Sequence, residues 1–196
     1  MLKIGITGGI GSGKSTICKV FETLNIPIYY ADIAAAVITN KNNEVKSQLI
    51  AKFGDEIYSY GMLDRKKLAR LIFNNSEALA FVNSVIHPAV KKDYENWLEI
   101  NKSALYTLKE AAILFESGAN TQVDKIISVY APQEIKIQRV MKREQITYEE
   151  VLRRISSQMP DEEKMRQSHF VIYNDETQLV IPQVLKIHNL LINSFL

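Results

Sequence analysis

A glycine-rich segment near the start of the chain constrains its fold and chemistry more than any other feature. Residues 8–15 read Gly-Gly-Ile-Gly-Ser-Gly-Lys-Ser, which matches the phosphate-loop pattern G-x-x-x-x-G-K-[ST]. Glycines let such a loop curl, so that successive backbone N–H groups point into one concavity and hydrogen-bond phosphate oxygens. Lys14 is long enough to reach β and γ phosphates, and the Ser15 hydroxyl suits a Mg²⁺ ion. The segment therefore predicts a site for ATP or GTP.

The residues around this loop predict an α/β fold. An apolar run, Leu2–Thr7, precedes the loop and is typical of a β-strand, and apolar residues at helical spacing follow it. Further apolar runs predict parallel strands at Ile28–Ala31, Ala104–Leu108, Lys125–Tyr130 and Phe170–Tyr173. Because helical patterns separate these runs, we expect an open parallel sheet covered by helices, with ligands at the carboxyl ends of its strands.

Length and composition limit the partners. The chain has 196 residues, enough for one domain with insertions, and its 46% hydrophobic and 23% charged residues are usual for a globular protein. A net charge of +2 argues against a broad basic surface for nucleic acid. The single Cys18 cannot form an intramolecular disulfide, and no apolar run reaches the length of a membrane span. The chain opens on a predicted strand with no leader, so we expect a cytoplasmic monomer or small homo-oligomer without a membrane partner.

We expect a single domain whose core consists of residues 1–31, 104–132 and 168–196, which contain the predicted strands. The last segment of the core, residues 177–196, is predicted to be a helix. Residues 32–103 are too many for a simple crossover, and we interpret them as a helical insertion that holds a second substrate. Helical patterns in the insertion cover Glu44–Phe53, Asp64–Phe73 and Ser76–Ile86. Asp64 and Ser76 are the expected N-caps, and Pro88 is expected to open a further helix.

A second helical segment, residues 133–167, carries clustered basic side chains and has expected breaks at 144–147 and 159–161. The basic residues are Lys136, Arg139, Arg143, Arg153 and Arg154. The first three recur at i, i+3 and i+7, hence on one face of a helix. Taken together, the arginines form either a solvated face of ion pairs with interleaved glutamates, or a helical lid that closes over ATP phosphates.

Among the classes of phosphate-loop proteins, a small kinase fits the sequence best. It contains no Asp-x-x-Gly, and Asn40-Lys41-Asn42-Asn43 lacks the aspartate that would bind a guanine ring, so a GTPase is a poor interpretation. A kinase must hold a second substrate, supply a base for its hydroxyl, and screen the phosphoryl group from water. Asp32 follows the second predicted strand and is the candidate base, with an N-cap as its alternative role.

Short blocks elsewhere accompany the phosphate loop. They are Asp32 with Ala34, Gly61 with Leu63-Asp64-Arg65, His87-Pro88, Leu114-Phe115-Glu116, Gln138-Arg139 with Arg143, Arg154 and Gln158, and Val171-Ile172 with Asn174. Together with the opening segment from Ile4 to Thr16, and in the same order, they resemble the dephospho-CoA kinase family, which catalyses the last step of coenzyme A biosynthesis. The resemblance spans nearly the whole chain.

The resemblance implies a P-loop kinase fold and Mg²⁺-dependent transfer of the ATP γ-phosphoryl group to the ribose 3′-hydroxyl of dephospho-CoA, giving coenzyme A and ADP. The implied catalytic residues are Lys14, Asp32 as base, and Arg139, which with Arg143 stabilises charge on the transferring group. The implied nucleotide-binding residues are Gly9, Gly11, Ser12, Gly13, Lys14, Ser15, Thr16, Arg143 and Asn174. Ser15 is the implied metal ligand, and Asp32, Arg65 and His87 are the implied residues for dephospho-CoA.

The sequence departs from the family pattern at two places. Ala112 stands where the family usually has proline, and Ser168-His169 replaces Ala-Asp. The second metal ligand stays open between Glu110 and Glu116, directly or through water. Two other functions also stay open: a regulatory or assembly protein that binds nucleotide without phosphoryl transfer, and a kinase for another small hydroxyl substrate such as a nucleoside or nucleoside monophosphate.

Overall fold

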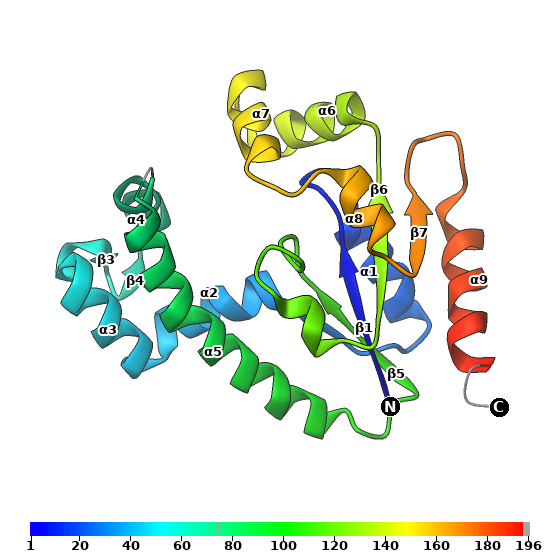
Figure 1. The fold of residues 1–196 in the computed structure, drawn as a ribbon, viewed down its shortest axis with the longest axis horizontal. Helices are drawn as coiled ribbons and strands as arrows, with labels where there is room; N and C mark the ends of the chain where they lie inside the picture. Colours follow the sequence, from blue (N-terminus) through cyan, green and yellow to red (C-terminus); the bar gives the residue numbers. More distant parts are fainter. Residues whose placement is uncertain (74, 194–196) are drawn as a thin grey trace. The chain divides into compact units, whose positions relative to one another are not determined.

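The computed structural model of the chain describes residues 1–73 and 75–193 (Figure 1). The chain forms two compact units, one of Met1–Tyr30 with Asn101–Leu196 and one of Ala31–Ile100. Among the described helices, none has the length and apolar character that crossing a membrane requires.

The first unit is built on a five-stranded sheet in the order β2-β5-β1-β6-β7, with every neighbouring pair parallel. Its strands are β1 Leu2–Thr7, β2 Ile28–Tyr30, β5 Tyr106–Glu110, β6 Lys125–Tyr130 and β7 Phe170–Tyr173. Strand β1 is central, and its Ile4 lies opposite Leu108 of β5 on one side and Lys125 of β6 on the other. The predicted parallel α/β sheet is confirmed. In such a sheet, the crevice beyond the carboxyl end of the central strand is the usual ligand site.

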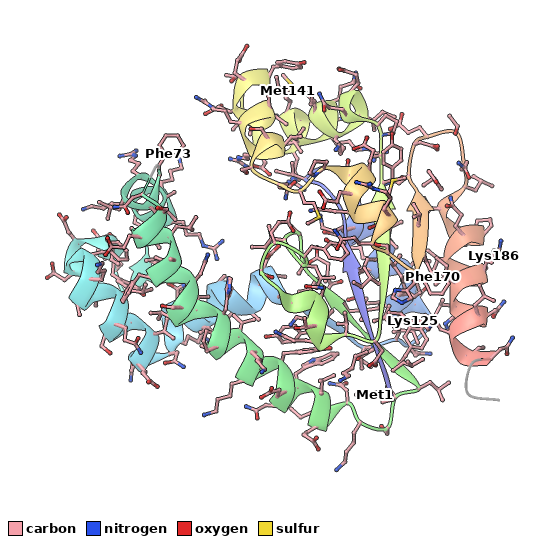
Figure 2. The ribbon with its side chains drawn as sticks, viewed as in Figure 1. Met1, Phe73, Lys125, Met141, Phe170 and Lys186 are labelled. Atoms are coloured by element: carbon pink, nitrogen blue, oxygen red, sulfur yellow. The ribbon has the colours of Figure 1, made fainter. Side chains whose placement is uncertain are left out.

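The helices of the first unit are α1 Lys14–Thr23, η2 Ala119–Gln122, α6 Gln133–Glu144, α7 Tyr148–Ser156, α8 Asp161–Arg166 and α9 Val180–Asn193. Helices α1 and α9 bury apolar side chains of the sheet. Ile4 and Ile6 of β1 share one fully buried cluster with Phe21 of α1 and Leu191 of α9. The exposed Lys186 of α9 points away from the sheet (Figure 2). The predicted C-terminal helix is present as α9, which begins at Val180 rather than at residue 177, and residues 194–196 of that prediction lie outside the described residues.

The second unit is mainly helical and has its own core. Its elements are α2 Ala31–Lys41, α3 Asn43–Phe53, η1 Asp55–Ile57, β3 Tyr58–Ser59, β4 Met62–Leu63, α4 Arg65–Ile72 and α5 Ser76–Ile100. Leu49, Ile57 and Val82 belong to one buried cluster. The Phe73 side chain, 71% exposed, projects from the end of α4 (Figure 2). Asp64 caps α4 as predicted, because its Oδ1 accepts from the N–H of Lys67 at 2.9 Å.

Helix α5 continues through Pro88, so the prediction that a new helix begins there is wrong. Proline lacks the N–H that would donate to the carbonyl of Ser84, one turn earlier. Residues on both sides of the proline, Val85 before it and Ala89 after it, pack on the same buried cluster. Burial of this apolar face offsets the single lost hydrogen bond, so the helix does not end.

Strand β5 spans Tyr106–Glu110 rather than the predicted Ala104–Leu108. The N–H of Ala104 donates to the carbonyl of Asn101 at 3.0 Å, which places Ala104 in the turn after α5. At the other end, pairing with β1 carries the strand through the buried, charged pair Lys109 and Glu110. Glu110 was expected in a loop after the strand and is instead its last residue.

The N-cap of α5 is also one residue earlier than the sequence predicts. The Asn75 Oδ1 accepts from the N–H of Ala78 at 2.9 Å, whereas Ser76 lies inside the helix. An Asn side chain at this position satisfies a backbone donor that the first turn would otherwise leave unpaired.

We expect Asn75→Ala to destabilise the chain by about 1 kcal/mol, which lowers the thermal midpoint of a protein of this size by about 2–4 °C. The matched control, Ser76→Ala, removes a hydroxyl that caps nothing and should leave the midpoint unchanged. Differential scanning calorimetry of both variants measures the difference. A larger loss in Ser76→Ala would contradict the observed position of the cap.

Candidate active site

The phosphate loop, residues 8–15, joins β1 to α1, and two of its glycines adopt left-handed backbone conformations. Gly11 has φ +80° and Gly13 has φ +95°. A Cβ on Gly11 would come within 2.5 Å of the carbonyl oxygen of Lys136, and one on Gly13 would overlap Nδ2 of Asn174. The two glycines therefore allow α6 and the loop after β7 to touch the phosphate loop itself.

Polar side chains of the loop have distinct environments. Lys14 is 8% exposed, and its Nζ donates to the carbonyl oxygens of Gly8 at 2.8 Å and Gly9 at 3.3 Å. Ser12 Oγ is buried and has no hydrogen-bond partner among the described residues. Ser15 is exposed in the first turn of α1, as is Thr16 beside it. A buried ammonium and a buried hydroxyl are thus placed within the loop, and a second hydroxyl stands open at the helix start.

Arg139 of α6 lies beside the loop. Its Nη2 donates to the carbonyl of Asn174 at 3.2 Å and to Glu176 Oε1 at 3.1 Å. Its Nη1 is buried with no hydrogen-bond partner in the described part of the chain, and it is 3.8 Å from where a Gly13 Cβ would be. Asn174 Nδ2 in turn donates to the carbonyl of Ser12 at 2.8 Å. The fold therefore brings Arg139 and Asn174 together at the phosphate loop.

Arg143, by contrast, lies in a surface ion-pair group. Arg143 and Arg154 of α7 both donate to the carboxylate of Glu144. These hydrogen bonds, that from Arg143 first, lower the pKa of Glu144 and outweigh the opposing effect of partial burial. Of the two interpretations of the basic face, ion pairing therefore describes Arg143 and Arg154 in this conformation. A role for Arg143 at the nucleotide stays a prediction.

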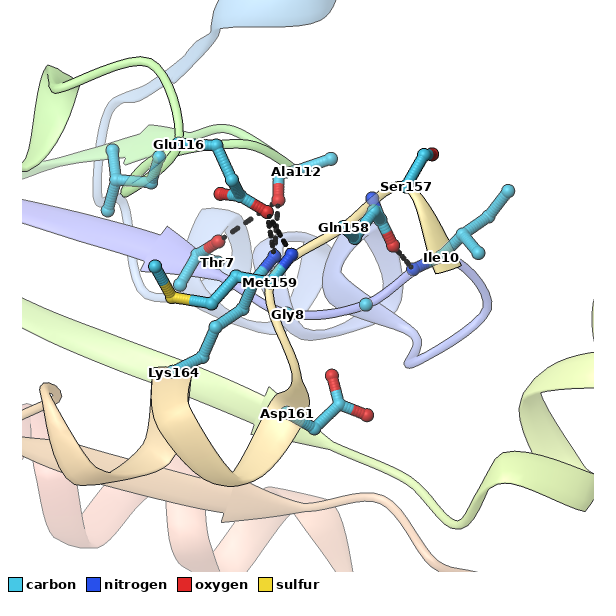
Figure 3. A network of polar contacts seen from close by, with 12 residues as sticks. Thr7, Gly8, Ile10, Ala112, Glu116, Ser157, Gln158, Met159, Asp161 and Lys164 are labelled. Carbon is cyan, nitrogen blue, oxygen red and sulfur yellow. Dashed lines mark hydrogen bonds and ion pairs between the residues drawn. The ribbon is translucent and has the colours of Figure 1, made fainter. Parts of the chain in front are cut away.

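Helices α6 and α7 contact the phosphate loop through apolar side chains, and the segment after α7 adds a hydrogen bond. Ile137 and Val140 of α6 and Val151 of α7 form a buried cluster on which Ile10 of the loop packs. The N–H of Ile10 donates to Gln158 Oε1 at 2.9 Å, as Figure 3 shows. The helical segment breaks near both predicted places, at 145–147 and at 157–160, whereas Glu144 is the last residue of α6 and Asp161 the first of α8.

A second network fixes the start of α8 to the segment after β5 (Figure 3). Lys164, 1% exposed, donates to Glu116 Oε1 and to the carbonyl of Ala112, both at 2.9 Å. The N–H of Met159 also donates to Glu116 Oε1 at 2.9 Å. Burial by itself would raise the pKa of Glu116, but the hydrogen bonds, chiefly from Lys164, hold it below the usual 4.5. Glu116 is therefore a charged anchor for α8, and the choice between Glu110 and Glu116 as metal ligand stays open.

Sequence reasoning missed a buried ion pair beside the loop, between Lys136 of α6 and Asp161 of α8. The sequence placed Lys136 on a basic helix face, but the side chain is 5% exposed and faces inward. Its partner lies 25 positions further along the chain, so no local pattern connects them. The pair lines a cavity of about 340 Å³ together with Gly9 and Gln158.

The two departures from the family pattern have clear structural partners. Ser168 Oγ donates to the carbonyl of Lys164 at 2.7 Å and lies 2.7 Å from Ser128 Oγ. His169 Nδ1 accepts from the N–H of Ile126 at 3.2 Å, which is the acceptor role that an aspartate could also fill. Ala112 contributes its carbonyl oxygen to the network of Figure 3.

The residues expected to bind the second substrate lie in the second unit. Asp32 is exposed in the first turn of α2, which begins at Ala31 because β2 ends one residue earlier than predicted. Asp32 is therefore inside the helix and not its N-cap. Arg65 is exposed as the first residue of α4, and His87 is half-buried in α5. Their roles stay predictions.

No group of three or more His, Cys, Asp or Glu side chains is placed to hold a metal ion, within the residues that the structure describes. A parallel sheet with a phosphate loop after its central strand, and an arginine held beside that loop, place the chain in the class of P-loop nucleotide-binding proteins.

Comparison with known proteins identifies the family within this class. The model of the family described as Dephospho-CoA kinase matches residues 2–179. The chain therefore belongs to the dephospho-CoA kinase family, as the sequence predicted. A dephospho-CoA kinase from Bacteroides fragilis is 38% identical over 186 residues, covering 95% of this chain and 91% of that protein. One from Porphyromonas gingivalis is 39% identical over 189 residues, covering 95% and 93%. The solved dephospho-CoA kinase from Campylobacter jejuni is 25% identical with a TM-score of 0.72, covering 99% and 98%.

Replacing Glu116 with Gln should destabilise the chain in a pH-dependent way. Because the folded pKa of Glu116 is lowered, its contribution is fully present above the unfolded value of 4.5 and is lost as pH falls through the folded value. We expect the thermal midpoint of Glu116→Gln to lie several degrees below wild type at neutral pH, with the gap closing as the pH falls below 4.5 and through the lowered folded pKa. Thermal unfolding followed by circular dichroism across this pH range measures it.

The control is Glu162→Gln, an exposed carboxylate on α8, which should match wild type throughout. A gap between wild type and Glu116→Gln that stays constant with pH would mean that the Glu116 charge does not hold Lys164.

Proposed function

We propose that the chain transfers the γ-phosphoryl group of ATP to the ribose 3′-hydroxyl of dephospho-CoA, the final step of coenzyme A biosynthesis. The observation that carries this proposal is Arg139, whose buried Nη1 lies beside Gly13 with no hydrogen-bond partner among the described residues. A buried guanidinium N–H without a partner is costly, unless it serves an anion that binds there. Membership of the dephospho-CoA kinase family supports the same activity.

In the proposed reaction, the nucleotide is held by the backbone N–H groups of Gly9, Gly11 and Gly13 and by the side chains of the loop. Residues proposed to contact it are Ser12, Lys14, Ser15, Thr16, Arg139, Arg143 and Asn174. Lys14 neutralises the β and γ phosphates, and Arg139 stabilises charge that spreads over the transferring group. Lys14 exchanges its bonds to the Gly8 and Gly9 carbonyls for bonds to phosphate oxygens.

The acceptor side of the proposal rests on the second unit. The 3′-hydroxyl oxygen bonds to the γ phosphorus while the bond from that phosphorus to the β-phosphate oxygen breaks, which releases ADP. Asp32 accepts the hydroxyl proton, and its exposure at the start of α2 leaves the carboxylate accessible. Arg65 and His87 are proposed to bind dephospho-CoA, since both lie in the same unit as Asp32.

Mg²⁺ is the proposed metal, and it would supply charge neutralisation on the β and γ phosphates. The exposed hydroxyl of Ser15 fits such an ion, which takes most of its ligands from phosphate and water. The lack of a dedicated carboxylate and histidine cluster among the described residues agrees with a metal that arrives with the nucleotide.

We further propose that the protein works in the cytoplasm as a monomer or small homo-oligomer, without nucleic acid or membrane partners. A net charge of +2 and a single, buried cysteine support this setting.

The direct test measures ADP release from Mg·ATP with and without dephospho-CoA, with mass spectrometry of the product. We expect ADP release that depends on dephospho-CoA and a product one phosphate heavier.

Asp32→Asn should lower kcat about 10²- to 10⁴-fold while ATP affinity is kept, because only the base is removed.

The control variant is Asp55→Asn, another exposed carboxylate of the second unit, and it should keep full activity. ATP binding with no phosphorylated product would exclude dephospho-CoA and favour another hydroxyl acceptor, such as a nucleoside monophosphate. An Asp32→Asn variant as active as wild type would show that another group accepts the proton.

Arg139→Ala should lower kcat about 10³-fold, in the range found for arginines that stabilise transferring phosphoryl groups. Arg139→Lys should restore little of this, because an ammonium cannot bond bidentately to phosphate. Steady-state kinetics with both substrates provide the measurement. Arg153→Ala, an exposed arginine of α7, is the control and should retain wild-type kcat. Equal losses in the Arg139 and Arg153 variants would contradict the role given to Arg139.

A further inference from the structure

The Lys136–Asp161 ion pair lies directly on the phosphate loop. Lys136 is 5% exposed and the Asp161 side chain 11% exposed. A Cβ on Gly9 would come within 2.8 Å of Asp161 Oδ1 and 3.2 Å of Lys136 Nζ. Both charges therefore touch the loop backbone at Gly9.

The position along the loop indicates which phosphate the pair would meet. Lys14 Nζ bonds to the carbonyls of Gly8 and Gly9, so the lysine that acts on the β and γ phosphates works at this end of the loop. The cavity of about 340 Å³ that Lys136, Asp161 and Gly9 line is large enough for a small charged group.

Stability alone is a weak reason for this pair. Burying two charges costs desolvation energy, and a buried ion pair is often no more stable than an apolar replacement. The two helices that it joins are also held by other contacts. Ile137 and Val140 fix α6 in an apolar cluster, and Lys164 fixes α8 through Glu116.

We propose that Lys136 is a further binding residue for the terminal phosphate of the nucleotide, and that Asp161 is a positioning residue that holds its ammonium at Gly9. An ammonium has three donors, so Lys136 can bond to the carboxylate and to a phosphate oxygen together. The inference rests on the proposed function only in needing a nucleoside triphosphate in the loop.

The test compares dissociation constants for Mg·ATP and Mg·ADP by isothermal titration calorimetry, without dephospho-CoA. Lys136→Met should raise the constant for ATP about tenfold or more and that for ADP less than about twofold, because only ATP carries the γ phosphate. In this variant the unpaired Asp161 carboxylate also repels the γ phosphate. Asp161→Asn removes the negative charge but keeps an amide oxygen that can still accept from the Lys136 ammonium and hold it at Gly9, so ATP affinity should equal or exceed that of wild type.

Two further variants complete the design. Lys142→Met removes an exposed lysine of the same helix and should match wild type for both nucleotides. The double variant Lys136→Met/Asp161→Asn leaves no unpaired buried charge, so it decides the question if Lys136→Met does not fold. The ratio of ATP affinity to ADP affinity in the double variant should still be lower than in wild type.

Equal losses for ATP and ADP, or equal losses in Lys136→Met and Asp161→Asn, would overturn the proposal, because a purely structural pair behaves in that way. An unchanged ratio of ATP to ADP affinity in the double variant would overturn it too. A wild-type chain that binds ATP but does not phosphorylate dephospho-CoA would contradict the proposed function and leave this inference standing.

Discussion

Close packing against the glycines of the phosphate loop is the constraint on which the rest of the site depends. The carbonyl of Lys136 and the side chain of Asn174 occupy space that a Cβ on Gly11 or Gly13 would fill. Because those atoms reach the loop, α6 brings Arg139 to it as well. The glycines thus do more than let the loop curl around phosphate, since they also set how near its neighbours can approach.

Positive charge around the loop is balanced by groups that the fold supplies. Lys14 bonds to loop carbonyls, Lys136 to Asp161, Lys164 to Glu116, and Arg139 to Glu176. A cluster of buried cations would otherwise oppose folding. Carbonyl oxygens and partly exposed carboxylates bind a cation less strongly than a polyphosphate does. Lys14 and Arg139 can therefore exchange these partners for phosphate oxygens when a nucleotide binds. Lys164, which is 1% exposed and held by Glu116 and by the Ala112 carbonyl, has a fixed structural role instead.

Local patterns predicted most of the fold correctly and failed where long-range packing decides. Strands β1, β6 and β7 begin and end as predicted, because each is a short apolar run bounded by polar residues or turns. β5 was misplaced because its buried end carries Lys109 and Glu110, which a hydropathy pattern assigns to a loop. The continuity of α5 through Pro88 was missed for a related reason, since it depends on a core that local sequence does not contain.

The sequence by itself determined the chemistry of the loop, the family and the order of the strands along the chain, because these depend on residue type and spacing over short segments. Only the tertiary structure decided which charged and polar groups meet. Lys136 and Asp161 are 25 positions apart, Arg139 and Asn174 are 35, and Ser12 and Asn174 are 162. The physical reason is that pairing over such separations follows from how helices and strands pack, and burial then fixes the partners through the cost of leaving a polar group or a charge unpaired.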